Sequence, residues 1–198
     1  MWYYGKTMTN KLFIPLLLGT NRKENKSEHA ARWLLGRVEK RSDIETVFLK
    51  AQDFKIPHDN CGEDIKDQFP GYRDAIIRAD GLIIVAPEYN HGYPGILKSI
   101  LDLLLKEYHH KAVGIVGTGG TLGGGRMVEN LLPVLRELGL IPIFKTMYFM
   151  RVGMLFDETG NVADKEYEGR ADEFLDELVW MAETLKWGRE NIPTTFRQ

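Results

Sequence analysis

Apolar residues along this chain fall into short continuous runs, separated by longer segments with a helical period. Four runs have the length and composition of buried strands, namely Leu12–Leu18, Leu82–Ala86, Ala112–Val116 and Leu140–Phe144 with its continuation to Phe149. A fifth segment, Ile44–Leu49, alternates more between apolar and polar residues and suits an edge strand. Pro15 removes one backbone donor from the first run, so we expect an edge position or a bulge there.

Helical patterns lie between and after these strands. They cover residues 27–40, 72–79, 95–108, 126–138 and 166–187. Serine is favourable at the start of a helix, so we expect Ser27 to be the N-cap of the first one. Pro133 predicts a kink or a fresh start in the fourth. Because strands alternate with helices, the sequence predicts an α/β fold in which a parallel sheet lies between two helical layers.

The predicted sheet has five parallel strands in the order 2-1-3-4-5. This order places the change of winding direction between the first and the third strand. The length of 198 residues and the hydrophobic content of 43% fit one globular core. We therefore expect a single domain over residues 11–190, with an N-terminal extension at 1–10 and a C-terminal tail at 191–198.

Charge and cysteine content narrow the classes of partner and location. The net charge is −2 with both signs well mixed, which gives no support for a nucleic-acid partner. No apolar run is long enough to span a bilayer and the N-terminus does not resemble a signal peptide, so we expect no membrane partner. The single cysteine, Cys61, favours a cytoplasmic protein, and its acidic neighbours disfavour a nucleophilic thiolate. The histidines are scattered, so no metal site is expected.

Ligands of open parallel sheets bind at the carboxyl ends of the strands, beside the change of winding direction. The loops expected there span residues 19–28, 87–95 and 117–126. In the first loop, Thr20, Arg22 and Ser27 offer hydroxyl and cationic donors just before a helix N-terminus. Such a set favours a phosphate group, because helix N-termini attract anions. The alternative is a solvated loop that ends in an ordinary serine cap.

The second and third loops suggest a flat ligand. The second loop reads PEYNHGYPG. The polar groups of Glu88–Asn90 and the rings of Tyr89 and Tyr93 suit a planar heterocycle such as a flavin. The alternative is an ordinary turn. The third, GTGGTLGGGR, lacks the lysine of a phosphate-cradling loop and places Leu122 where a dinucleotide motif needs its last glycine. Its glycines would let the backbone approach a flat ring, unless they only make a flexible surface loop.

Three stretches of the chain are distinctive: Gly19-Thr20-x-Arg22 with Ser27-Glu28, then PEYNHGYPGILKSILD, then GTGGTLGGGR. Together they resemble the NADPH-dependent FMN reductase family, and the resemblance covers residues 11–150. The resemblance implies a flavodoxin-like three-layer sandwich, bound FMN, and NADPH or NADH as co-substrate. It implies that the FMN phosphate is bound by Thr20, which replaces the usual serine, and by Arg22 and Ser27. It also implies a set of residues around the isoalloxazine ring: Pro87, Glu88, Tyr89, Asn90, Gly92 and Tyr93, and on the other edge Gly117, Thr118, Gly119 and Gly120.

The family reduces quinones, azo dyes, chromate or free flavin, so the resemblance implies an NAD(P)H-dependent oxidoreductase that acts on small-molecule acceptors and forms homodimers or homotetramers. The cofactor carries the chemistry, so no catalytic side chain is expected, and His91 and Tyr93 are candidate substrate contacts. Without a separate dinucleotide groove, nicotinamide and acceptor must use one flavin face in turn, which predicts ping-pong hydride transfer through bound FMN. The alternative is a flavodoxin-like electron carrier, or an FMN-binding module without turnover of its own.

Overall fold

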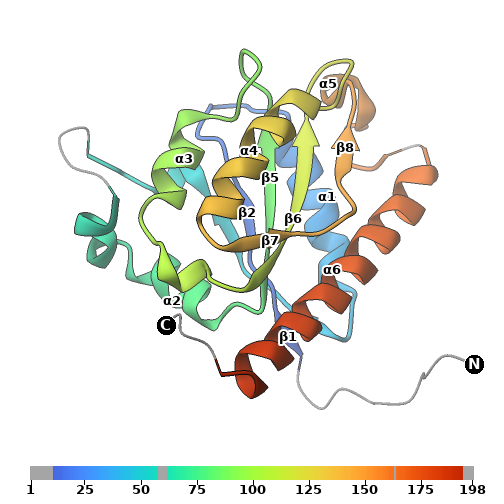
Figure 1. Cartoon of the computed structure of the whole chain (residues 1–198). Helices are drawn as coiled ribbons and strands as arrows, with labels where there is room; N and C mark the ends of the chain where they lie inside the picture. Colours follow the sequence, from blue (N-terminus) through green and yellow to red (C-terminus); the bar gives the residue numbers. More distant parts are fainter. Residues whose placement is uncertain (1–10, 58–61, 163, 194–198) are drawn as a thin grey trace, which may run out of the picture.

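A parallel sheet with helices on both faces forms the protein (Figure 1), as seen in a computed structural model that describes residues 11–57, 62–162 and 164–193. Its strands are β1 (Leu12–Phe13), β2 (Leu16–Leu18), β3 (Ile44–Glu45), β4 (Phe48–Lys50), β5 (Gly81–Pro87), β6 (Lys111–Thr118), β7 (Leu140–Pro142) and β8 (Met147–Phe149). The main sheet has six strands in the order β4-β2-β5-β6-β7, and β8 also pairs with β6. β1 and β3 form a separate parallel pair.

The predicted fold class is confirmed, but the predicted count of five strands is wrong, because the first, second and fifth are each divided in two. Pro15 has no N–H group and separates β1 from β2, although its carbonyl still accepts a hydrogen bond from Ile83 N at 2.9 Å. Thr46 lies between β3 and β4, and its hydroxyl donates a hydrogen bond to Ile14 O at 2.7 Å. β7 and β8 pair with opposite halves of β6, so the chain leaves the sheet between them.

The helices follow the predicted patterns in place but not always in length. They are α1 (Ser27–Glu39), α2 (Pro70–Arg78), α3 (Gly95–Leu101), α4 (Gly125–Glu137), α5 (Val152–Leu155) and α6 (Glu166–Asn191), with 3-10 turns η1 (Ala51–Asp53), η2 (Gly62–Gln68) and η3 (Lys106–Tyr108). The predicted helix at 95–108 ends early, at Leu101, and the chain beyond it is not α-helical although Leu103 and Leu104 are both buried. Pro133 lies inside α4, so the predicted fresh start does not occur.

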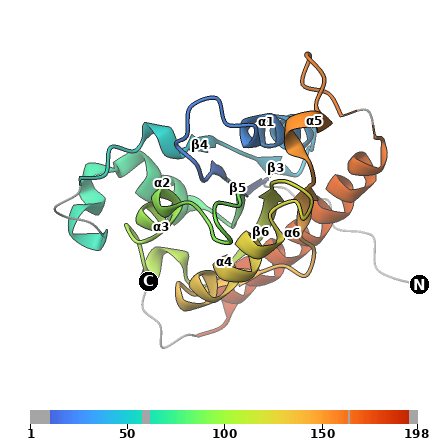
Figure 2. The same ribbon diagram turned by 90° about the horizontal axis from the view of Figure 1, so that it is seen from above.

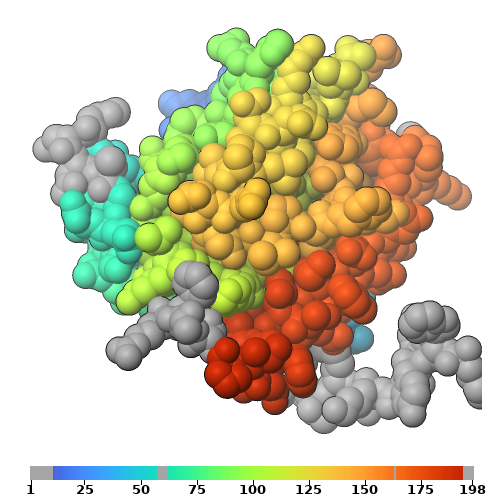
Figure 3. Space-filling view, viewed as in Figure 1, coloured from blue at the N-terminus to red at the C-terminus, as the bar shows by residue number. Residues whose placement is uncertain are grey.

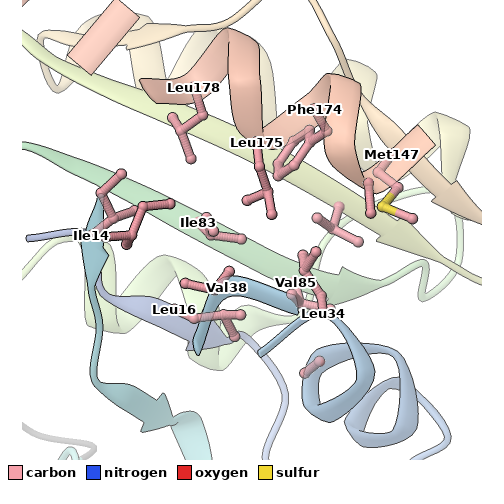
Figure 4. Packing of buried hydrophobic residues seen from close by; sticks show 14 of the residues in the cluster. Ile14, Leu16, Leu34, Val38, Ile83, Val85, Met147, Phe174, Leu175 and Leu178 are labelled. Carbon is pink, nitrogen blue, oxygen red and sulfur yellow. The ribbon is translucent and has the colours of Figure 1, made fainter. Parts of the chain in front are cut away.

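Two apolar layers cover the two faces of the sheet. Alternate residues of the strands point to opposite faces, so Leu16 and Leu18 pack toward α1 and α6 whereas Leu17 packs toward α2, α3 and α4. Figure 4 shows the first layer, in which Phe174 and Leu178 of α6 meet the sheet beside residues of α1. Within the described residues, no helix has the length and hydropathy that crossing a membrane requires.

Candidate functional site

The carboxyl ends of β2, β5 and β6 bring the three predicted ligand loops together. These strands are neighbours in the sheet, and their ends are aligned, since Leu18 pairs with Val85 and Pro87 with Thr118. Figure 2 looks onto this end of the molecule, where the loops after β2 (blue), β5 (green) and β6 (yellow) lie side by side. The three loops therefore lie together at the carboxyl ends of these strands, as predicted.

Backbone N–H groups without acceptors gather in the loop between β2 and α1. The N–H groups of Lys23, Glu24, Lys26 and Ser27 have no hydrogen-bond acceptor in the part of the chain that the structure describes. The exposed side chains of Arg22, Lys23 and Lys26 make no ion pair with any described residue. Unused N–H groups, free cations and the positive end of a helix of 13 residues together make a site for an anion.

The acidic residue in the first turn of α1 does not oppose an anion there, because two cations neutralise it. Glu28 Oε1 accepts hydrogen bonds from Arg32 Nη2 at 2.7 Å and Lys50 Nζ at 3.1 Å. Burial alone would raise the pKa of the Glu28 carboxyl, but the hydrogen bonds from Lys50 and Arg32 outweigh burial, so that pKa is lowered. Glu28 therefore stays ionised and paired near neutral pH.

A hydroxyl pair joins this first loop to the second. Thr20 Oγ1 lies 2.9 Å from the Tyr89 hydroxyl and also accepts a hydrogen bond from Arg22 N at 3.3 Å. Thr20 is buried, whereas Tyr89 is half-buried. The Tyr89 hydroxyl, which sequence reasoning left without a partner, thus contacts a residue that we expected to bind phosphate.

A second hydroxyl pair joins the first loop to the third. Ser27 Oγ lies 2.6 Å from Thr118 Oγ1, and Thr118 Oγ1 also donates to Ala86 O at 3.3 Å. The predicted N-cap role of Ser27 is wrong: Lys26 is the N-cap, and the side chain of Asn25 accepts the hydrogen bond from Glu28 N at 2.9 Å. Thr118 is fully buried, so its hydroxyl serves contacts within the protein.

The second loop forms a tight hairpin that stands out from the end of β5. Tyr89 and Gly92 exchange backbone hydrogen bonds of 2.9 and 3.0 Å. Asn90 and His91 between them have φ of 49° and 69°, the left-handed values of a type I′ turn, and both are exposed. Asn130 Nδ2 of α4 donates to His91 O at 2.8 Å and fixes the turn from outside. This arrangement gives a rigid ledge, as the residue types of the loop suggest.

Glu88 turns its side chain toward α4. Its carboxylate accepts from Arg126 N at 3.1 Å and from Arg126 Nη1 at 3.4 Å. A cavity of about 330 Å³ opens beside this pair and is lined by Glu88, Gly120, Thr121, Leu122, Gly124 and Arg126. The carboxylate expected to face a flavin ring thus already has a protein partner, and this partner cannot be read from the local sequence.

The glycines of the third loop serve two purposes. A Cβ on Gly119 would lie 2.9 Å from Gly124 N, and one on Gly117 would lie 2.6 Å from Gly123 O, so these two glycines let the loop pack on itself. Nothing lies within 4 Å of the position of a Cβ on Gly120, which is exposed. Gly120 alone among these three leaves open space for a ligand.

The segment after β8 supports the third loop from behind, which the sequence patterns did not reveal. Gly119 N donates to Phe149 O at 3.3 Å, and Arg151 N donates to Gly120 O at 2.7 Å. A second cavity of about 480 Å³ lies on this side, lined mainly by apolar side chains: Thr121, Met150, Arg151, Met154, Leu155, Asp164 and Tyr167. Cys61 lies outside the described residues, and no group of metal-ligating side chains occurs within them.

Comparison with known proteins identifies this arrangement. A family model described as NADPH-dependent FMN reductase matches residues 14–152, which is most of the chain. The chain belongs to that family. As an NADPH-dependent FMN reductase it is an oxidoreductase that uses FMN and NAD(P)H.

Curated relatives of this reductase carry names of the same kind. An FMN-dependent NADPH-azoreductase from Staphylococcus haemolyticus is 25% identical over 83% of this chain and 92% of its own length. A 2-hydroxy-1,4-benzoquinone reductase from a Burkholderia species is 25% identical over 85% of this chain and 94% of its own length.

One solved structure shows the same fold. The flavoenzyme NAD(P)H:acceptor oxidoreductase FerB from Paracoccus denitrificans is 20% identical, has a TM-score of 0.73, and the match covers 87% of this chain and 98% of FerB. At this identity the likeness supports only the flavodoxin-like fold of the reductase, and not its substrate or its mechanism.

The described residues of the reductase fit FMN. The ribityl phosphate of FMN requires an anion site, and the N–H groups and cations between β2 and α1 supply one. The isoalloxazine ring requires a flat surface with polar groups along its edge. The Tyr89–Gly92 hairpin and the open side of Gly120 follow neighbouring strands and border such a surface. The fit rests mainly on groups that have no other partner in the described chain.

Proposed function

We propose that this reductase binds FMN at the carboxyl ends of β2, β5 and β6 and reduces quinones or azo compounds with NAD(P)H in a ping-pong cycle. The observation that carries the proposal is the group of N–H donors and cations without acceptors at the start of α1. It lies one strand away from a polar hairpin, at the place where ligands of open α/β sheets bind. The names of the relatives supply the acceptor classes.

In this proposal the phosphate is held by Arg22, by Thr20 and by the N–H groups of residues 23, 24, 26 and 27. The backbone of Pro87–Asn90, with Gly92 and Tyr93, lies along one edge of the ring, and Gly117–Gly120 lie along the other. When bound, FMN accepts a hydride from NAD(P)H and delivers it to the acceptor. The protein binds the cofactor, orients it and leaves one face open. His91 and Tyr93 stay candidate contacts for substrate.

The ping-pong order follows from having one open face. The glycine-rich loop does not contain a dinucleotide fingerprint, so nicotinamide must stack where the acceptor also stacks. NAD(P)+ must then leave before the acceptor enters. We expect parallel double-reciprocal lines and competition between NADPH and high acceptor concentrations.

Stopped-flow spectroscopy of the FMN-loaded protein tests this order. NADPH should bleach the visible flavin absorbance in the absence of acceptor, and a quinone added afterwards should restore it. Intersecting double-reciprocal lines, with bleaching only when acceptor is also present, would show two separate sites. Turnover with 2-hydroxy-1,4-benzoquinone and with an azo dye would identify the favoured acceptor class. An electron carrier without turnover is not favoured, because the relatives are named as reductases.

A homodimer or homotetramer in the cytoplasm is part of the same proposal. Large apolar side chains are exposed on both sides of β8, including Phe144 before it at 88% and Met154 after it at 87% of their surface. Figure 3 shows the molecular face on which the edge of the sheet after β7 lies between α4 and α6. Exposed apolar groups of this size favour a partner surface. Sedimentation velocity should give more than one chain per particle, and a monomer at micromolar concentration would contradict it.

A further inference from the structure

The two hydroxyl pairs beneath the proposed flavin site use their protons in opposite ways. A hydroxyl group has one proton to donate and two lone pairs that accept. A phosphate oxygen in its ionised form can only accept. A hydroxyl side chain can therefore bind phosphate as a donor only if the protein does not already use its proton. The contacts of Thr20 and Ser27 decide which of the two has its proton available.

Whether Thr20 has a proton to give depends on the direction of its contact with Tyr89. Its Oγ1 accepts from Arg22 N at 3.3 Å, and a backbone N–H can only donate. The second contact of Thr20, at 2.9 Å, is with the Tyr89 hydroxyl. A phenol donates more readily than an aliphatic hydroxyl, because its oxygen lone pair is delocalised into the ring. With Tyr89 as the donor, both lone pairs of Thr20 are in use and its proton has no acceptor among the described residues.

Ser27 has no proton to give. Thr118 Oγ1 lies 3.3 Å from Ala86 O, and a carbonyl can only accept, so Thr118 donates its proton there. Ser27 must then be the donor in its 2.6 Å contact with Thr118. Only this direction satisfies both contacts.

We propose that Tyr89 is a positioning residue for the phosphate of FMN: its hydroxyl donates to Thr20 and thereby directs the Thr20 proton to the phosphate. Ser27, in contrast, ties the first loop to the third and offers the phosphate only its backbone N–H. This inference rests on the proposed flavin site. It assigns the Tyr89 hydroxyl to phosphate selection, whereas the resemblance places this residue at the isoalloxazine ring. A buried donor proton without an acceptor is unfavourable, and a phosphate oxygen would supply the acceptor.

Fluorescence titration of the apoprotein with FMN and with riboflavin, which lacks the phosphate, tests the assignment. Tyr89→Phe should weaken FMN binding by about threefold to tenfold and leave riboflavin binding within about twofold. Thr20→Val should show the same selectivity with a loss of about tenfold or more, and Thr20→Ser should restore FMN binding. Ser27→Ala should leave the ratio of FMN to riboflavin affinity unchanged. Tyr93→Phe is the control for selectivity: Tyr93 lies in the same loop and its hydroxyl does not contact Thr20, so any change should affect FMN and riboflavin by the same factor.

A double-mutant cycle separates action through Thr20 from a direct effect. In the Thr20→Val protein, Tyr89→Phe should add no further loss of FMN affinity. Additive losses, a selective loss of FMN in Ser27→Ala, or equal behaviour of Tyr89→Phe and Tyr93→Phe would overturn the inference. An unmodified protein that does not prefer FMN to riboflavin would overturn the proposed phosphate site itself, which distinguishes the two failures. Circular dichroism of each variant reports whether the fold is retained.

Discussion

The two ends of the sheet both carry charged and polar residues but arrange them in opposite ways. At the carboxyl end, cations and N–H groups before α1 have no partner among the described residues. At the amino end, the buried carboxylate of Asp80 accepts from Phe13 N at 3.1 Å, Lys186 Nζ at 3.0 Å and Arg189 Nη2 at 3.3 Å. At the carboxyl end the donors have no acceptor among the described residues, whereas at the amino end the donors are already paired.

This difference shows how a binding site can be told from a structural polar cluster. A buried charge is stable only when the chain pairs it, so the cluster around Asp80 holds β1, β5 and α6 together. Exposed cations and free N–H groups contribute little to stability, so a ligand can use them without loss to the fold. Changes at the amino end should therefore alter stability, and changes at the carboxyl end should alter flavin affinity.

The largest effect is expected from Asp80→Ala. The change leaves Lys186, Arg189 and Phe13 N without their shared acceptor, and breaking a buried ion pair costs about 3–5 kcal/mol in the free energy of unfolding. Urea denaturation should show this loss. The ratio of FMN to riboflavin affinity should not change under native conditions.

Asp176→Ala is the matched control for Asp80. Asp176 also pairs with an arginine, Arg41, but its side chain is 68% exposed. Exposed pairs are worth about 0–1 kcal/mol, so this variant should stay close to the parent. Equal losses in the two variants would show that burial does not distinguish the amino end.

Lys111 gives the amino end a dependence on pH. Burial, with a smaller contribution from Arg189, lowers the pKa of this lysine to about 8 from the ordinary 10.5. Between pH 8 and pH 10.5 the folded protein has lost this proton while the unfolded chain still holds it. Stability relative to Lys111→Met should therefore rise with pH across this window, by about 3 kcal/mol in total. The two proteins should keep a constant difference below about pH 7.

Urea denaturation of the parent and Lys111→Met at several pH values measures this difference. Subtracting one from the other removes the titration of the remaining groups. A difference that stays flat from pH 8 to pH 10.5 would show that the Lys111 amine has an ordinary pKa. A falling difference would show that the folded state binds this proton more tightly than the unfolded chain.

At the carboxyl end, Arg22→Ala should weaken FMN binding by about 1.5–3 kcal/mol, the worth of one charged hydrogen bond. Riboflavin has no phosphate and should bind as before. Arg22 is exposed and makes no ion pair with a described residue, so stability should not change. Arg136→Ala, which removes an exposed arginine near the end of α4, is the control and should leave both affinities unchanged. Equal loss of both flavins in Arg22→Ala would place Arg22 away from the phosphate.

How far these features can be predicted from the sequence depends on the distance between partners. The apolar runs and the loop chemistry are local, so the sheet, its helical layers and the clustering of the three loops could be predicted. Ser27 looks like an N-cap locally, but its hydroxyl contacts Thr118, which is 91 positions away. Asp80 meets Lys186 and Arg189 across 106 and 109 positions, and no local rule reveals such a pair.

The same reasoning applies to Pro15 and to the helix after Gly95. A proline in an apolar run signals an interruption, and the chain is divided there as expected. Leu103 and Leu104 continue an apolar helical pattern in sequence, yet both are buried beyond the end of α3. Periodicity does not distinguish a buried loop from a buried helix when every residue is apolar.

The smallest effects are expected within the glycine-rich loop. Of two adjacent glycines there, Gly119 should affect mainly stability and Gly120 mainly flavin affinity. A Cβ on Gly119 would lie 2.9 Å from Gly124 N, so Gly119→Ala should force the loop apart and lower stability by about 1–2 kcal/mol. Flavin affinity should fall as well, because Gly120 is attached to the displaced backbone. Gly119 therefore serves the packing of the loop itself, in addition to the expected approach of the backbone to a flat ring.

Gly120→Ala is the matched change one position further along. Nothing lies within 4 Å of its new Cβ, and Gly120 N has no acceptor among the described residues, so stability should stay within about 0.5 kcal/mol of the parent. FMN and riboflavin should both bind more weakly, and by the same factor, because the ring and not the phosphate would meet the added methyl group. Thermal unfolding and paired flavin titrations of the two variants measure these effects. If Gly120→Ala left both affinities intact, the ring would not lie against this loop, and the open space at Gly120 would be ordinary surface.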